Sequence, residues 1–122
     1  MGITPPFLNL VVLRSPDIDR AVKFYGVIGL SFNKHAHGSG PEHYASSLSG
    51  FVFEIYPATE KNPATVSTRI GFSVVSVDAL IPLLEAEGGK VVTAPQDSEW
   101  GRRAVVKDVD GHTVELVAAL KS

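Results

Sequence analysis

Apolar residues follow two different spacings along this chain. Residues 7–13 (FLNLVVL) form a short apolar, β-branched run that predicts a strand. Apolar residues then recur every three or four positions, which is typical of a helix with one face against a sheet. Ser15 as the cap and Pro16 as the first helical residue predict where this helix begins, and Gly26 or Gly29 where it ends. Its apolar positions are Ile18, Ala21, Val22, Tyr25 and Ile28.

The rest of the chain divides in the same way into short strands, one further helix and polar connections. Residues 35–43 (HAHGSGPEH) are too rich in glycine and polar residues for a regular element and predict a loop. A polar stretch with two prolines, about 58–68, predicts a linker between two halves. The remaining predicted strands are 30–34, 44–48, 51–56, 69–75, 90–93, 102–107 and 113–118, with a second helix over 78–87.

The two halves repeat one another. A shift of 61 positions, half of the 122 residues, places Ser15 on Ser76, Asp17 on Asp78, Gly50 on Gly111 and Glu54 on Glu115. Such a repeat indicates that one supersecondary unit occurs twice. We therefore predict an α+β fold with the element order βαβββ in tandem. A single domain, 1–122, would hold module one (about 7–57), the linker and module two (about 69–120).

Alternation along the two closing strands assigns side chains to faces. In both strands the bulky apolar residues point to the helix side. Glu54 and Glu115 then point to the opposite side, Glu54 with Tyr56 and Glu115 with Val117. If the two sheets curl toward each other, this side lines a cavity. A glutamate inside an apolar strand is costly to bury unless something binds it.

Composition excludes several classes of function. The chain is 44% hydrophobic and 20% charged, as in an ordinary globular protein. A net charge near −2 offers no basic surface for nucleic acid, and no apolar run is long enough to span a membrane. The absence of cysteine excludes disulfides and thiolate metal sites. The first residues do not resemble a signal peptide, so we expect a cytoplasmic protein.

Two segments carry a resemblance to a known family. Residues 10–32 (LVVLRSPDIDRAVKFYGVIGLSF) are similar to the first strand and helix of the vicinal oxygen chelate superfamily, which includes glyoxalase I, bleomycin resistance proteins and extradiol dioxygenases. Residues 105–117 (VVKDVDGHTVELV) resemble its closing strand pair, with Val109 in place of the usual proline. The resemblance covers nearly the whole chain. It implies two βαβββ modules in a curved, partly open, barrel-like sheet with the helices outside.

The resemblance also implies where a metal would bind. Metal-dependent members take His or Gln from the first strand of each module and Glu from the last. The matching positions here are Leu10 and Gly71 on the first strands, with Glu54 and Glu115 on the last. Leucine and glycine offer no donor atom, so we expect no metal cofactor. A divalent ion would need both glutamates with a histidine from the loop or from a partner subunit. The candidate histidines are His35, His37 and His43, although a glycine-rich polar loop of this kind is more often simply solvated.

Other residues are candidates for contacting a ligand. Arg14 would meet a substrate carboxylate, or else form a salt bridge. Trp100 and Arg102 follow a loop of the kind that rims a pocket, although Trp100 would equally serve packing or a dimer contact. The full set of predicted substrate-binding positions is Leu10, Arg14, Tyr56, Val75, Trp100, Arg102 and Val117.

Two functions fit these positions. One is a glyoxalase/bleomycin-resistance-like homodimer with a cavity for a small organic molecule. It would act as a sequestering protein, or as a metal-independent lyase or isomerase whose base is Glu54 or Glu115. In the enzyme, repulsion between the two carboxylates would raise one pKa toward neutrality, unless neighbours such as Arg14 already satisfy them. The alternative is a divalent-metal-dependent lyase or dioxygenase, of which the lyase is favoured. A third hypothesis is a vestigial site in a protein whose role is now assembly.

Overall fold

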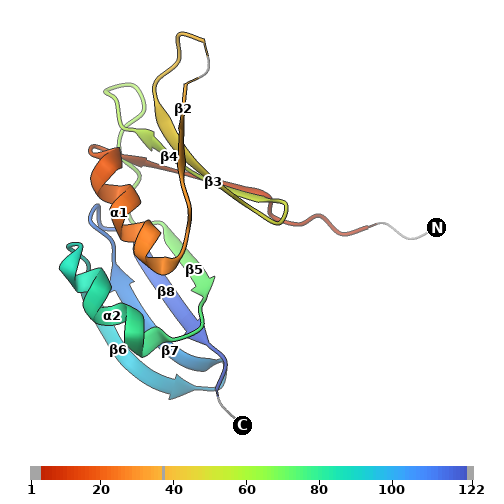
Figure 1. Cartoon of the computed structure of the whole chain (residues 1–122), viewed down its shortest axis with the longest axis vertical. Coiled ribbons are helices and arrows are strands. Elements are labelled where there is room, and N and C mark those ends of the chain that lie inside the picture. The colour runs from red at the N-terminus through yellow and green to blue at the C-terminus, as the bar shows by residue number, and fades with distance from the viewer. Residues whose placement is uncertain (1–3, 37, 121–122) are drawn as a thin grey trace.

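The chain folds into two four-stranded mixed sheets, each with one helix on one side (Figure 1). This computed structural model describes residues 4–36 and 38–120. The strand orders β1-β4-β3-β2 and β5-β8-β7-β6 are the same in both modules, and the sheets stay open, which confirms the predicted tandem βαβββ fold. Module one contains β1 (Leu10–Ser15), α1 (Ile18–Ile28), β2 (Asn33–His35), β3 (His43–Leu48) and β4 (Phe51–Pro57). Module two contains β5 (Arg69–Ser73), α2 (Val77–Ala86), β6 (Lys90–Ser98), β7 (Gly101–Lys107) and β8 (Thr113–Ala118).

The two helices begin differently, which the sequence repeat did not predict. Asp17, not Ser15, is the N-cap of α1, and its carboxylate accepts the N–H of Arg20 at 3.1 Å. The hydroxyl of Ser15 instead accepts the N–H of Asp17 at 3.1 Å. In α2 the matching serine, Ser76, is itself the N-cap. The aligned serines therefore have different roles at the two helix starts.

Strand bounds also differ from the predicted ones. β1 begins at Leu10, three residues after the start of the apolar run, because Phe7 and Leu8 lie outside the sheet and are 77% and 69% exposed. β2 is shorter and later than predicted, and β6 continues to Ser98 through two irregularities in its pairing with β7. The segment before Asn9 leads away from the body of the molecule (Figure 1), whereas the carbonyl oxygen of Asn9 still accepts the N–H of Val52 at 2.8 Å.

One apolar core joins the two modules. Tyr25 of α1 lies near its centre, with its ring centroid 5.1 Å from that of Phe53 in β4 and 6.1 Å from that of Phe72 in β5. Core residues of both modules, among them Leu13 of β1 and Leu116 of β8, belong to the same cluster. The helices α1 and α2 contact one another over this core. Both modules therefore need each other to bury their helix-side residues.

None of the helices in the described part of the chain is long and apolar enough to cross a membrane.

Candidate functional site on the sheet faces opposite the helices

The sides of the two sheets that face away from α1 and α2, here called the helix-free faces, carry both predicted glutamates. Phe53, Ile55 and Leu116 are buried on the helix side, and Glu54 and Glu115 are half-buried on the other, as alternation predicts.

Strand register decides which residue neighbours each glutamate. In module two, Gly71 of β5 lies opposite Glu115, as the resemblance implies. In module one, Val12 of β1 lies opposite Glu54, whereas Leu10 lies opposite Val52. Leu10 shares the face but lies two residues away from the predicted position. Neither Val12 nor Gly71 has a side-chain donor atom.

Glu115 lies between two arginines. Oε2 accepts from Nε and Nη2 of Arg69 at 3.2 and 3.0 Å, and Oε1 accepts from Nε of Arg103. The hydrogen bond from Arg103, followed by that from Arg69, lowers the pKa of Glu115 despite an opposing effect of burial. This direction is opposite to the raised pKa that repulsion between two glutamates would give Glu115. Its partners are also not Arg14 or Tyr56, the donors considered from the sequence.

Glu54 lies beside a histidine. Its Oε2 is 3.4 Å from Nε2 of His43 on the neighbouring strand β3, and the His43 side chain is 1% exposed. The sequence had left His43 among the histidines of a loop. Instead β3 begins at this residue and directs its ring onto the helix-free face.

A row of four side chains crosses this face, one from each strand of module one. The register aligns Arg14 with Tyr56 and His35 with His43. The rings of His43 and Tyr56 stack and so join the two pairs, with a centroid distance of 4.0 Å and an interplanar angle of 7°. The guanidinium carbon of Arg14 lies 5.3 Å from the Tyr56 ring centroid, and the ring centroids of His35 and His43 are 5.9 Å apart. We call Arg14, Tyr56, His43 and His35 the stacked row.

The helix-free faces carry more positive than negative charge. Register places Arg69, Arg103, Lys107 and Lys90 on the face of module two with Glu115, and Arg14 on that of module one with Glu54. Five fixed cations thus accompany two carboxylates in a chain whose net charge is −2. The excess lies on the face of module two, with four cations against one carboxylate, whereas module one carries one of each. An excess of cations on a face of an acidic protein favours an anionic ligand there.

Several predicted binding residues lie elsewhere. Arg102 pairs with Ala118 on the helix side and binds Asp78 of α2 at 2.9 and 3.0 Å and Asp97 at 3.2 Å, so it does not line the predicted cavity. Trp100, in the β6–β7 turn, is 69% exposed, and Val75, after β5, is fully exposed. Leu10, Arg14, Tyr56 and Val117 do lie on the helix-free faces. His37 lies outside the described residues.

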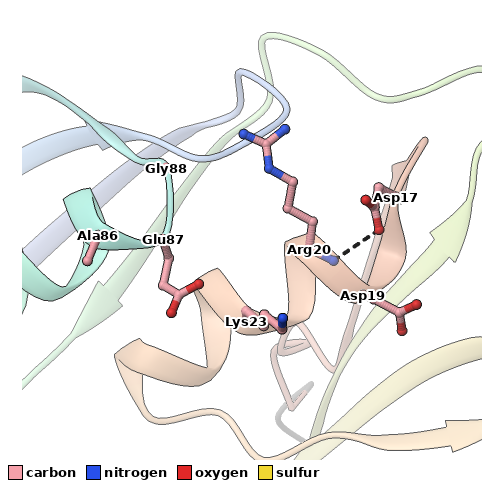
Figure 2. A pocket seen from close by; sticks show the side chains of 7 residues that line it. All are labelled: Asp17, Asp19, Arg20, Lys23, Ala86, Glu87 and Gly88. Atoms are coloured by element: carbon pink, nitrogen blue, oxygen red, sulfur yellow. Dashed lines mark hydrogen bonds between the residues drawn. The ribbon is translucent and has the colours of Figure 1, made fainter.

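Neither Glu54 nor Glu115 lines any of the five best-formed cavities of the described residues. In the described part of the chain, Glu54 contacts His43 while Glu115 contacts arginines of its own module. A groove of about 600 Å³ lies on the helix side instead, between the start of α1 and the end of α2 (Figure 2). Acidic and basic side chains both line it, so it does not select a ligand by charge. Its residues are Asp17, Asp19, Arg20, Lys23, Ala86, Glu87 and Gly88.

The residues present do not fit the metal site that the resemblance implies. Val12 and Gly71 supply no ligand, and both oxygens of Glu115 accept hydrogen bonds from arginine. Glu54 and His43 alone make two ligands, fewer than a structural or catalytic zinc site uses.

A second group of metal-binding residue types is Asp108, Asp110 and His112, whose ligand atoms lie within 4.8 Å of one another. Here the Asp108 carboxylate already accepts hydrogen bonds from His112 and Tyr25 at 2.7 and 2.5 Å. The sequence placed His112 on the helix side as a turn residue, and it is indeed buried there, 1% exposed. Its bond to Asp108 is local, but its bond to Thr65, 47 positions away in the sequence, has no local signal.

Comparison with known proteins agrees with the fold and with the resemblance. The sequence model of the Glyoxalase/Bleomycin resistance protein/Dioxygenase superfamily matches residues 7–116. An uncharacterized protein of Mycolicibacterium smegmatis is 31% identical over 114 residues, which cover 93% of this chain and 95% of that protein. A lactoylglutathione lyase of Arabidopsis thaliana is 31% identical over 124 residues, which cover 88% of this chain. The match covers 42% of the plant enzyme, so the chain spans less than half its length.

Solved structures resemble the whole chain. The antibiotic-binding protein TnmS3 of a Streptomyces species superposes with a TM-score of 0.74 at 20% identity, over 97% of this chain and 99% of that one. TioX of a Micromonospora species superposes with a TM-score of 0.66 at 26% identity, over 91% and 97%. The chain therefore belongs to the glyoxalase/bleomycin resistance protein/dioxygenase superfamily.

Proposed function

We propose that this chain is a sequestering protein that binds a small organic anion on its helix-free faces without a metal. The observation that carries the proposal is the excess of positive charge there, five cations against two carboxylates in a protein of net charge −2. Folds of this kind host both binding proteins and enzymes, so the argument rests on the side chains.

Arg14 is the proposed primary contact. A guanidinium carries five N–H donors, and toward the described residues that of Arg14 donates one hydrogen bond, from Nη1 to the carbonyl oxygen of Pro57 at 3.3 Å. Its position over the Tyr56 ring orients the guanidinium, which therefore loses little freedom on binding a carboxylate in a two-pronged manner. The Tyr56 hydroxyl supplies a further donor. The similar fold of the antibiotic-binding protein TnmS3 is consistent with a binding role.

Glu115 supports binding rather than acid–base chemistry. Because two arginines hold its pKa below the ordinary value, it stays ionised at neutral pH and is a poor acceptor for a substrate proton. Its function in this proposal is to orient Arg69 and Arg103.

Calorimetric titration with benzoate tests the proposal, with uncharged benzamide as the matched ligand. We expect saturable binding of benzoate only, weakened about tenfold or more in Arg14→Met and Tyr56→Leu, since one charge-assisted contact is worth about 1.5–3 kcal/mol. Arg102→Met, on the helix side, is the control and should bind like the wild type. Equal binding of benzamide, or wild-type affinity in Arg14→Met, would contradict the proposal.

A proton-transferring lyase is the second candidate, favoured by the pairing of Glu54 with His43 at 3.4 Å. An imidazole beside a carboxylate is an arrangement that enzymes use to move a proton. The similarity to a lactoylglutathione lyase suggests the assay, formation of lactoylglutathione. Activity that disappears in Glu54→Gln but persists in Glu115→Gln would establish this candidate. Activity that needs an added divalent ion would favour the metal-dependent alternative.

We also propose that the functional unit is a homodimer. The apolar side chains of Leu10 and Val12 lie on the helix-free face of module one and are 48% and 37% exposed. Phe7 and Leu8, just before β1, are exposed apolar residues as well. A second copy of the chain covering them would also enclose a ligand. Light scattering should show a dimer that Leu8→Glu together with Val12→Glu dissociates; a wild-type monomer at high concentration would contradict the proposal.

A further inference from the structure

A continuous series of hydrogen bonds runs from the core of the molecule to Arg14. It begins at Asp108, which follows β7 and is 4% exposed. One carboxylate oxygen, Oδ2, lies 2.5 Å from the hydroxyl of Tyr25 and 2.7 Å from Nδ1 of His112. The other, Oδ1, accepts the backbone N–H groups of Asp110 and His112, each at 2.9 Å. Both oxygens are therefore occupied, and the carboxylate has a fixed orientation.

The position of the carboxylate determines the proton on His112. Nδ1 faces a carboxylate and so carries a hydrogen, and in the neutral imidazole Nε2 is then an acceptor. The hydroxyl oxygen of Thr65, in the linker, lies 2.6 Å from Nε2, and the carbonyl oxygen of Arg14, at 3.2 Å, is a second acceptor for the same hydroxyl hydrogen. Thr65 is therefore bound by a buried group of module two, although it follows module one in the chain.

Thr65 in turn binds the backbone of Arg14. Its hydroxyl oxygen accepts the N–H of Arg14 at 3.0 Å, and its own N–H donates to the carbonyl of Arg14 at 3.1 Å. β1 is the edge strand of its sheet, so Thr65 replaces a neighbouring strand at this one residue. These bonds fix the backbone at the end of the stacked row.

The hydrogen-bonded series from Asp108 through His112 to Thr65 has the order of acid, base and hydroxyl found in nucleophilic triads. Here the hydroxyl is engaged by both His112 and the Arg14 backbone, and His112 is 1% exposed. Thr65 lines none of the five best-formed cavities of the described residues. The geometry accordingly assigns this group to holding a backbone segment rather than to attacking a substrate.

We propose that Thr65 and His112 are positioning residues for Arg14, through which the buried pair of module two sets the ligand affinity of module one. The inference rests on the proposed function insofar as Arg14 contacts the ligand, but the placement of Arg14 is measurable without any ligand. Loss of the Thr65 hydroxyl leaves Nε2 of His112 and the Arg14 N–H without their partner. The Arg14 backbone then shifts, and its guanidinium leaves the position over Tyr56.

The test compares Thr65→Val with Thr65→Ser. Valine keeps the shape of threonine and removes the hydroxyl, whereas serine keeps the hydroxyl. We expect Thr65→Val to bind benzoate about tenfold more weakly, Thr65→Ser to restore most of the affinity, and both to remain folded by circular dichroism. His112→Asn, which keeps a donor toward Asp108 and loses the acceptor toward Thr65, should resemble Thr65→Val.

Nuclear magnetic resonance without ligand separates this inference from the proposed function. The wild-type spectrum should show His112 protonated at Nδ1, and Thr65→Val should move the backbone and guanidinium signals of Arg14 while Thr65→Ser leaves them in place. If benzoate fails to bind the wild type, the proposed function is wrong, and these signals still decide the inference. Unchanged Arg14 signals in Thr65→Val would overturn it, as would wild-type benzoate affinity in that variant.

Discussion

Val12 of β1 lies opposite Glu54 of β4, and so takes beside that glutamate the position that Gly71 of β5 takes beside Glu115. The sequence repeat indicates Leu10 instead, because that residue aligns with Gly71 after the shift of 61 positions. The pairing differs because Leu10 pairs with Val52, 42 residues later, whereas Gly71 pairs with Glu115, 44 residues later. The two modules therefore differ in register by two residues.

Register makes a direct prediction about metal binding. Val12→His places an imidazole beside Glu54 and on the face that already carries His43, which completes three ligands of the kinds that zinc prefers. We expect Val12→His to bind Zn²⁺ at least about tenfold more tightly than the wild type in a competition titration. Leu10→His is the matched control, because its imidazole would lie beside Val52. Equal zinc affinity in the two variants would contradict this register.

The second prediction concerns the charge of Glu115. The hydrogen bond from Arg103 is the largest cause of its lowered pKa. Arg103→Met should therefore raise the pKa of Glu115. The ¹³C resonance of the Glu115 carboxyl carbon, recorded during a pH titration, measures this pKa. Arg69→Met should raise it less, because Arg69 is the more exposed partner. If Arg103→Met raises the pKa of Glu115 less than Arg69→Met does, then Arg69 is the arginine that lowers this pKa more.

Much of the fold could be predicted from the sequence because its signals are local. The apolar spacing at Ala21 and Tyr25 and the alternation around Glu54 each depend on a few neighbouring residues, and both faces are as expected. The repeat then adds long-range information, since it states that two similar units must share one core. Helix starts were less accurate because Ser15, Asp17 and Ser76 can all serve as caps.

The site could be predicted only in part because its contacts depend on register. Arg103, rather than Arg102, faces Glu115, and one residue of shift reverses this assignment. The sequence predicts that the strand after the loop begins at Tyr44, which leaves His43 in the loop. In the structure β3 begins one residue earlier, at His43. The bond between Thr65 and His112 joins residues 47 positions apart and has no local signal.

The third prediction concerns stability in acid. Burial acts to raise the pKa of Asp108, but hydrogen bonds from His112 and Tyr25 outweigh it and lower the pKa below the ordinary 3.8. Because the folded-state pKa is the lower one, the stabilisation is complete above about pH 4 and disappears as the pH falls through the lowered value. Asp108→Asn should reduce the free energy of unfolding by about 2 kcal/mol at pH 7, measured by urea unfolding. The difference from the wild type should shrink at pH 3.

Asp110 provides a control of opposite sign. Burial, with the nearby Asp108 carboxylate, raises the pKa of Asp110 above 3.8. Its contribution is therefore present below about pH 4 and is lost as the pH rises through the raised value. Asp110→Asn should keep or increase stability at pH 7, unlike Asp108→Asn. Equal losses in the two variants at pH 7 would show that the turn tolerates neither change, whatever the charge.

The last prediction concerns two glycines in contrasting surroundings. Gly101, the first residue of β7, has φ +130°, and an added Cβ would lie 2.3 Å from the carbonyl oxygen of Ala118. Gly101→Ala must strain its own backbone and displace β8, so we expect a loss of about 2–4 kcal/mol. Gly26 lies within α1 with open space around it, and Gly26→Ala should add about 0.5–1 kcal/mol, because alanine loses less backbone entropy in a helix. Chemical unfolding of both variants measures the difference. Gly101 lies beside Val117, and Val117 belongs to β8, the strand that carries Glu115. Only Gly101→Ala should therefore also disturb the helix-free face of module two.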